Sequence, residues 1–191
     1  LLMFPAANDM RDARTRALRD EIARLPDVAG VAVSHMPFNV GQNITTLRRE
    51  GGQVTDLAIY VMTPEFFDVL GVKPVAGRLY DPTLDGAREP GRVVINASAA
   101  RRLGFATAQD AVGKSLINPD GDSGPKQIVG IAPDIRHRSA RDEQQPTAYL
   151  LHDQVGMFIV RTRANPEATA HAIETLWPRH FPNETLGVVR M

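Results

Sequence analysis

A short polar segment in the last third of the chain carries the residue types best suited to chemistry. Asp134, Arg136 and His137 stand close together, and Arg138 follows them. A carboxylate beside an imidazole can transfer protons in general acid–base catalysis. The same residues also suit a loop held in place by ion pairs and hydrogen bonds. We favour this second interpretation and predict that Asp134, Arg136 and His137 are structural or interaction residues.

The chain offers no motif for nucleophilic catalysis. It contains no cysteine, which excludes disulfides, thiolate zinc sites and cysteine nucleophiles. There is no Gly-x-Ser-x-Gly elbow, and Ser34 and His35 would face opposite ways if they are neighbours on a strand. No glycine-rich phosphate loop occurs. The sequence therefore predicts a protein that is not an enzyme.

Metal ligands are also missing at useful spacings. The 5 histidines are scattered, without a His-x-x-x-His or Glu-x-x-His pair. Asn118, Asp120 and Asp122 alternate as calcium-loop ligands do, but Ser123 and Val129 occupy the positions that require Gly and Glu. We interpret this segment as a turn and expect neither a metal nor a cofactor.

The amino-acid composition limits which classes of protein and partner remain possible. The chain has 191 residues, 43% hydrophobic and 23% charged, which is ordinary for a globular protein of one domain or two small ones. The balance of 22 basic and 22 acidic residues argues against a nucleic-acid partner. No run approaches the roughly 18 apolar residues of a membrane span, and no signal peptide is visible. Because the first residue is Leu, we expect a fragment from which targeting or membrane segments have been removed.

The beginning of the chain has a strand–helix–strand pattern. Residues 1–4 are apolar, and a helix is expected to open at Asn8 or Asp9, whose side chains can cap free N–H groups. Pro26 ends that helix before the β-like segment 30–33.

The end of the chain repeats this pattern. Residues 157–160 are apolar, Asn165 and Pro166 open a second helix, and 187–189 follow as a strand. Trp177 lies on the apolar stripe of that helix and is predicted to be a core anchor rather than a ligand platform. Neither copy can bury its helix face alone. We expect one four-stranded sheet with both helices on one face and the strand order 4-1-3-2.

The middle of the chain reads as an insertion of short strands and helices. Thr63, Pro64 and Glu65 indicate a helix start with a hydroxyl cap. Phe66, Phe67 and Leu70 follow and are expected to be buried. Gly71 would end this helix. Short strands are expected at 56–62, 92–96, 127–131 and 147–151, which suggests a mixed α+β insertion.

Five segments, in chain order, resemble the MacB-like periplasmic core domain of FtsX-like ABC transporter permeases. They contain Thr63-Pro64-Glu65-Phe66-Phe67 with Ala76-Gly77-Arg78, then Val93-Val94-Ile95-Asn96, Val112-Gly113-Lys114, Ile128-Val129-Gly130 with Asp134-Ile135-Arg136-His137, and Pro146-Thr147-Ala148-Tyr149. The resemblance covers most of the chain. Leu151 stands where the family usually has proline, and residues 36–53 match no family segment.

The resemblance implies an α+β fold with two subdomains. Residues 1–53 and 152–191 would form a porter-like split βαβ-βαβ (ferredoxin-like) subdomain with its connecting loop. Residues 54–151 would form an inserted, mixed α+β, Sabre-like subdomain. The terminal repeat supports this division independently of the family.

The resemblance also implies a function and a location. One membrane helix would precede the domain and three would follow it, so that the domain projects from the cell inner membrane into the periplasm or the cell exterior. Partners would be a second permease copy in a dimer, a cytoplasmic ATPase subunit acting through the membrane part, and a periplasmic protein. The domain would be non-catalytic and would relay ATP-driven motion of the membrane helices to substrate or partner.

Two other functions remain open at this point. One is a free-standing periplasmic binding or adaptor module of the same fold, and the other is a small hydrolase. Apolar segments of at least about 18 residues on both sides of the chain would favour the permease over the module. Hydrolase activity that is lost on His137→Ala would favour the enzyme.

Overall fold

The computed structural model describes residues 1–35, 43–86, 91–119, 121, 124–135, 145–154, 156–187 and 189–190. The protein is mixed α+β, as predicted, and its contacts divide it into two compact units. The first unit comprises Leu1–Pro37, Met62–Gly71 and His152–Met191, and the second comprises Phe38–Val61 and Val72–Leu151.

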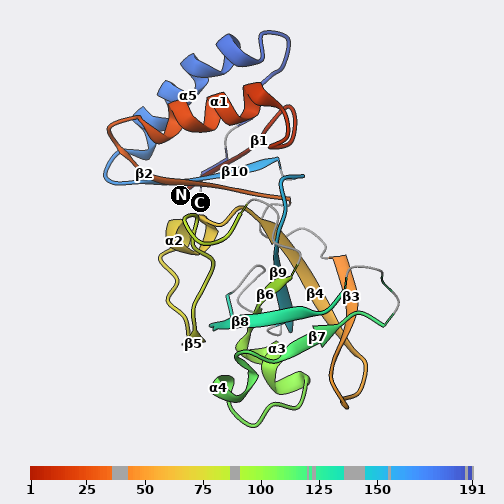
Figure 1. Ribbon diagram of the computed structural model, residues 1–191. Coiled ribbons are helices and arrows are strands. Elements are labelled where there is room, and N and C mark those ends of the chain that lie inside the picture. Colours follow the sequence, from red (N-terminus) through yellow and green to blue (C-terminus); the bar gives the residue numbers. More distant parts are fainter. Residues whose placement is uncertain are drawn as a thin grey trace. The chain divides into compact units, whose positions relative to one another are not determined.

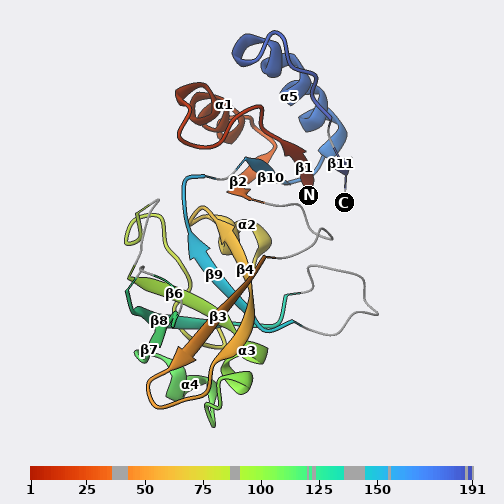
Figure 2. The ribbon, with the colours of Figure 1, turned by 90° about the vertical axis from the view of Figure 1, so that its right-hand side faces the viewer.

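An antiparallel sheet forms the centre of the first unit. Its strands are β1 (Leu2–Pro5), β2 (Val28–Ser34), β10 (Met157–Thr162) and β11 (Val189–Arg190). They lie in the order β11-β1-β10-β2, and each neighbouring pair is antiparallel. The strands of this unit, numbered 1 to 4 along the chain, have the predicted order 4-1-3-2, and the first and last strands lie side by side (Figure 2).

Two helices cover one face of this sheet, as expected. They are α1 (Ala13–Ala23) and α5 (Pro166–His180), which lie against each other (Figure 1). Leu18 and Ile22 of α1 and Ile173 of α5 are fully buried, because these apolar stripes face the sheet.

The predicted start of α1 at Asn8 or Asp9 is wrong. Asp12 is the N-cap residue, and its side chain accepts a hydrogen bond from the Arg14 N–H. Asp9 makes the same local contact with the Arg11 N–H, at 2.9 Å. Only Asp12 is followed by a continuing helical ladder, which begins with the bond from Arg16 N to Asp12 O. The start of α5 is confirmed, since Asn165 caps it and Pro166 occupies its first turn.

A third helix, α2 (Phe66–Leu70), packs on the opposite face of the sheet, against β2 and β10 (Figures 1 and 2). Phe66 and Phe67 are buried, as predicted, whereas Leu70 is only half-buried and Val69 takes the third buried position. The predicted hydroxyl cap by Thr63 is wrong, because its Oγ1 instead accepts a hydrogen bond from the Val33 N–H, at 3.1 Å. Gly71 ends the helix in a left-handed conformation, with φ of +70°, as expected.

The contact division falls between residues 151 and 152, where the sequence also placed a boundary, but it does not fall between 53 and 54. Met62–Gly71, which contains α2, groups with the first unit because the apolar side of α2 packs on β2 and β10. The strand β3 (Asn43–Arg49) groups with the second unit because it pairs with β4 (Thr55–Met62) over five residue pairs.

The second unit is built on a closed barrel. Besides β3 and β4, its strands are β6 (Arg92–Asn96), β7 (Ser115–Ile117), β8 (Lys126–Ala132) and β9 (Thr147–Leu151). They follow the order β4-β3-β7-β8-β6-β9, and β9 pairs back with β4, so the ring closes. Closure leaves these strands with no long unpaired edge. The sequence predicted several of the strands but not the barrel.

Two short helices complete the second unit. They are α3 (Ala97–Arg102) and α4 (Ala108–Ala111), which lie together at one end of the strands (Figure 2). Ala99 and Leu103 from the α3 region and Ala111 from α4 join Ile95 and Ile128 in one buried core. The two-residue strand β5 (Ala76–Gly77) pairs with β8.

The burial of Phe67 predicts a large loss of stability when its ring is removed. Phe67→Ala should lower the free energy of unfolding by roughly 3–5 kcal/mol, because the cavity adds to the lost transfer energy. Asp68→Ala on the same helix is the matched control, since Asp68 is exposed. It should change the free energy by less than about 0.5 kcal/mol. Denaturant unfolding followed by circular dichroism measures both, and an unchanged midpoint for Phe67→Ala would exclude this packing.

The pairing of β1 with β11 predicts a disulfide. Met3 lies opposite Val189, and directly opposed residues have Cα atoms about 4.5–5.5 Å apart, within the roughly 7 Å that a bridge requires. The double variant Met3→Cys/Val189→Cys should oxidise readily and keep the native circular dichroism spectrum. Met3→Cys/His171→Cys is the control and should stay reduced, because His171 is exposed on α5. If the first pair also resists oxidation, the observed strand order is wrong.

Candidate functional site

Asp134 follows β8 and binds the first turn of α3. One carboxylate oxygen accepts a hydrogen bond from the Ser98 N–H, at 2.8 Å, and the other accepts one from the Ser98 hydroxyl, also at 2.8 Å. Arg101 donates to the second oxygen at 3.1 Å. Arg136 and His137, predicted to act with Asp134, lie outside the described residues. The bonds to α3 favour the structural interpretation of Asp134 over proton transfer.

Asn96, at the end of β6, links α3 to β9. Its Oδ1 accepts hydrogen bonds from the N–H groups of Ala99 and Thr147, both at 2.9 Å. Its Nδ2 donates to the Gln145 carbonyl, at 2.9 Å. The sequence placed Asn96 at the end of the expected strand 92–96. It gave no indication of the bonds to β9, because that strand lies some fifty residues further along the chain.

Gly77 and Gly130 allow β5 to lie unusually close to β8. The two residues are paired, and a Cβ atom on Gly130 would stand 1.9 Å from the Arg78 carbonyl oxygen. Gly77 has a φ of +64°, a conformation that residues with side chains rarely adopt. The close approach places Arg78 at the mouth of a buried charged cluster.

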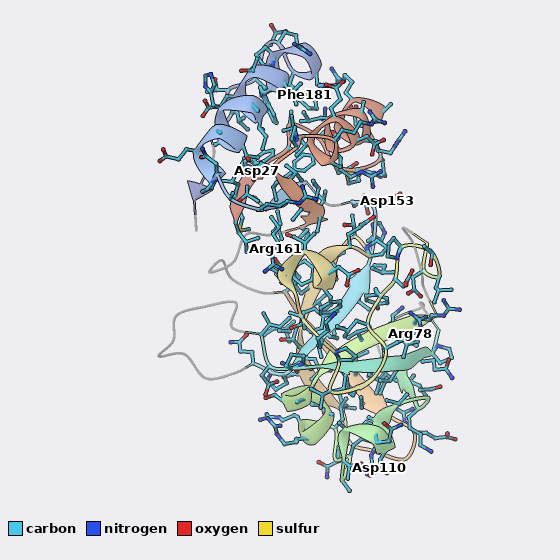
Figure 3. All side chains as sticks on the ribbon, turned by 90° about the vertical axis from the view of Figure 1, so that its left-hand side faces the viewer. Asp27, Arg78, Asp110, Asp153, Arg161 and Phe181 are labelled. Carbon is cyan, nitrogen blue, oxygen red and sulfur yellow. The ribbon has the colours of Figure 1, made fainter. Side chains whose placement is uncertain are left out.

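Asp85 is the centre of that cluster and is only 2% exposed. Arg78 (Figure 3) donates to both of its oxygens, at 2.5 and 2.9 Å. Arg92 donates at 2.8 Å and the Asp81 N–H at 2.9 Å. Burial alone would raise the pKa of Asp85, but the hydrogen bonds from Arg78, Asp81 and Arg92 outweigh it and lower the pKa to about 2. The cluster thereby ties segment 78–85 to the start of β6.

Asp27 connects the two halves of the first unit (Figure 3). It lies just before β2, and its carboxylate accepts hydrogen bonds from the N–H groups of Ala164 and Asn165, at 2.8 and 2.9 Å. The Thr169 hydroxyl donates to it at 3.0 Å. These bonds, with that from Asn165 the strongest, hold the pKa of Asp27 below its usual range. We call this arrangement the Asp27 clamp, since it fastens the start of α5 to the turn between α1 and β2.

Arg163 reinforces the Asp27 clamp from the other side. Its guanidinium donates to the carbonyls of Pro26 and Val28, and its own N–H donates to the Asp27 carbonyl at 2.8 Å. The clamp therefore joins residues separated by more than a hundred positions. No sequence signal pointed to it, because a turn aspartate has many alternative partners.

Trp177 lies in the core between α5 and the sheet. It is 4% exposed, and its Nε1 donates to the Glu184 carbonyl at 2.9 Å. Its ring meets Phe4 edge-on, with centroids 6.4 Å apart, and Phe181 at 4.9 Å. Phe4 stacks on Phe158 of β10. The ring is thus enclosed by other side chains of the first unit and presents no open face for a ligand.

Arg161 fixes α2 to the sheet. It stands on β10, beside α2 in Figure 3, and its Nη1 donates to the Val69 carbonyl at 3.0 Å. A Cβ atom on Gly71 would stand 2.7 Å from the same nitrogen, so glycine leaves room for the guanidinium. Like Asp27, Arg161 was not identified from sequence.

The structure gives no evidence of a metal site in the part of the chain that it describes. No group of three or more His, Cys, Asp or Glu side chains there is arranged to hold a metal ion. Asp120, Asp122 and Ser123 of the calcium-like segment lie outside the described residues. Among the described helices, none combines the length and apolar character needed to cross a membrane.

Comparison with solved structures shows the same fold in the extracytoplasmic parts of ABC transporters. The periplasmic region of MacB from Actinobacillus actinomycetemcomitans matches with a TM-score of 0.70 and 15% identity, covering 99% of this chain and 87% of that one. The extracellular domain of the noncanonic ABC-type transporter YknZ from Gram-positive bacteria matches with a TM-score of 0.68 and 14% identity, covering 100% and 99%. A domain of a putative permease from Porphyromonas gingivalis gives 0.63 and 18%, covering 98% and 88%. A search of curated proteins finds no similar sequence.

These solved structures, at 18% identity or less, show the fold of the chain. The family profile of the MacB-like periplasmic core domain matches residues 3–176. The chain belongs to this family, which confirms the resemblance found in its motifs.

The Asp85 cluster predicts a pH-dependent contribution to stability. The pKa of about 2 in the folded protein lies below the ordinary value of 3.8, so the stabilisation is present above about pH 4 and is lost as the pH falls through about 2. The difference corresponds to about 2 kcal/mol. Asp85→Asn should lower the free energy of unfolding by about 2 kcal/mol at pH 7. It should also flatten the acid limb, the fall of this free energy as the pH drops below about 4. Asp56→Asn is the control, because Asp56 is exposed. An unchanged acid limb in Asp85→Asn would contradict the assignment.

Proposed function

We propose that this domain relays the ATP-driven motion of membrane helices to a substrate or partner outside the cytoplasmic membrane. The observation that carries the proposal is the antiparallel pairing of β1 with β11, in which Leu2 lies opposite Arg190. The two segments enter and leave one sheet at the same point (Figures 1 and 2). A displacement of flanking helices would therefore act on two hydrogen-bonded neighbours in one sheet.

The construction of the first unit suits this role. Its sheet is made by both ends of the chain, and the Asp27 clamp, with its bonds to Asn165 and Thr169, joins the two βαβ halves. Charge-assisted hydrogen bonds of this kind are stronger than neutral ones. We assign the first unit to the porter-like subdomain and the second, with its closed barrel, to the Sabre-like subdomain.

The domain itself is proposed to be non-catalytic and to need no cofactor. Three polar motif residues that the structure describes are occupied by structural bonds: Asn96 and Asp134 hold α3, and Arg78 holds Asp85. A group that catalyses proton transfer must instead reach the reacting atom of a substrate. The energy would come from a cytoplasmic ATPase subunit acting through the membrane part.

The proposal includes two further partners. A second permease copy would form a dimer in the intact transporter, located at the cell inner membrane, and a periplasmic protein or the substrate would receive the motion. The sequence on either side of this chain can distinguish the permease from the free-standing module. Apolar segments of at least about 18 residues on both sides of this chain support the permease, and their absence supports the module.

The relay can be tested by distance measurements in the intact permease, reconstituted with its ATPase subunit. A spin label on His171→Cys reports on α5 in each copy, since that side chain is 84% exposed. Pulsed electron resonance should show a shift of the label-to-label distance between the nucleotide-free and ATP-bound states. The shift should shrink in Asp27→Ala, whose clamp is broken, while ATP hydrolysis continues.

The matched control is Asp68→Ala, which removes an exposed carboxylate and should keep the full shift. Identical distance distributions with and without ATP, in a transporter that hydrolyses ATP, would refute the relay.

A further inference from the structure

The second unit contains a hollow of about 900 Å³ that none of the structural roles above explains. Its walls come from the end of β3, the turn between α3 and α4, α4 itself and the start of β7. Asp110, labelled in Figure 3, marks this end of the unit. Ligand sites in proteins commonly enclose about 300–1,000 Å³.

Arg49 is the residue around which the hollow is built. Its guanidinium lies over the ring of Phe105, 5.4 Å from the ring centroid. Gly104 lies beside it, and a Cβ atom at that position would be in ordinary contact with Nη2, at 3.5 Å. The Nε atom of Arg49 is buried and makes no hydrogen bond within the described part of the chain. Buried polar atoms normally have such a partner.

The other charged residues of the hollow leave the guanidinium uncompensated. The Asp110 carboxylate is engaged in a capping box, where it accepts bonds from the Thr107 N–H at 3.0 Å and hydroxyl at 2.7 Å. Glu50 and Lys114 line the rim and are exposed. Among the described residues no ion pair joins Arg49 to a carboxylate. By contrast, Arg78 and Arg92 both pair with Asp85.

We propose that this hollow binds an extended peptide segment through one of its Asp or Glu side chains. A guanidinium stacked on an aromatic ring is held ready for two parallel hydrogen bonds to a carboxylate. Glu50 would accept hydrogen bonds from backbone N–H groups of the same peptide. A phosphate suits the hollow less well, because its second negative charge would face Glu50 and Asp110. The site is made by the second unit alone, so it stands apart from the relay.

The test uses blocked tripeptides and the nitrogen-15-labelled 191-residue chain. Acetyl-Ala-Glu-Ala-amide should cause saturable shifts of the amide signals of Arg49, Gly104 and Phe105. Acetyl-Ala-Gln-Ala-amide should bind at least about tenfold more weakly, since the charge-assisted pair is lost. Equal binding of the two peptides, or no saturable shift with either, overturns the proposal. Inorganic phosphate that saturates the same signals at lower concentration also overturns it in favour of a general anion site.

Conservative variants separate recognition from folding. Arg49→Lys keeps the positive charge but loses the planar guanidinium. It should weaken the binding of the glutamate peptide by at least about tenfold. Arg48→Lys, on the neighbouring residue, should leave the affinity unchanged. The spectrum outside the hollow reports that each variant is folded. Unweakened binding by a folded Arg49→Lys contradicts the proposed role of the guanidinium.

Discussion

The pairing of β10 with both β1 and β2 is the constraint on which the first unit depends. Without β10, the first strand–helix–strand segment, residues 1–35, has one helix and two strands that do not pair with each other. Met157, at the start of β10, lies opposite Ser34, at the end of β2. The inserted chain therefore leaves and re-enters the sheet at one point. The cost of closing so long a loop grows only slowly with its length, so a large insertion is tolerated there.

The polar side chains that could take part in chemistry mostly hold backbone segments together. Asn96 and Asp134 fix the start of α3, Asp85 gathers Arg78 and Arg92, and Asp27 fastens α5. The carboxylates of Asp27, Asp85 and Asp134 each accept hydrogen bonds from several donors. This distribution suits a domain that transmits displacement, because bonds between distant segments limit internal deformation.

The chain shares its fold with the periplasmic region of MacB and the extracellular domain of YknZ at only 15% and 14% identity. What the chain displays is a pattern: apolar periodicity, helix caps, and glycines where two backbones approach. Gly77 and Gly130 illustrate the last of these, since a Cβ on either would meet backbone atoms of the facing strand. Arg49, whose Nε has no hydrogen-bond partner among the described residues, is instead the basis of the proposed peptide site.

The sequence by itself determined the local elements, the repeated strand–helix–strand ends, the order of their strands and the family. These follow from apolar periodicity and from residues such as Asn165, Pro166 and Gly71, which act within a turn of helix. Asp9 and Asp12 show the limit of that reasoning, because both make the same local bond and only one begins a helix. Tertiary structure alone decided the barrel closure by β4 and β9, the placement of α2 on the first sheet, and the partners of Asp27, Asp85 and Arg161. Those contacts join segments far apart in the chain, and many pairings satisfy the same local pattern until the whole core selects one.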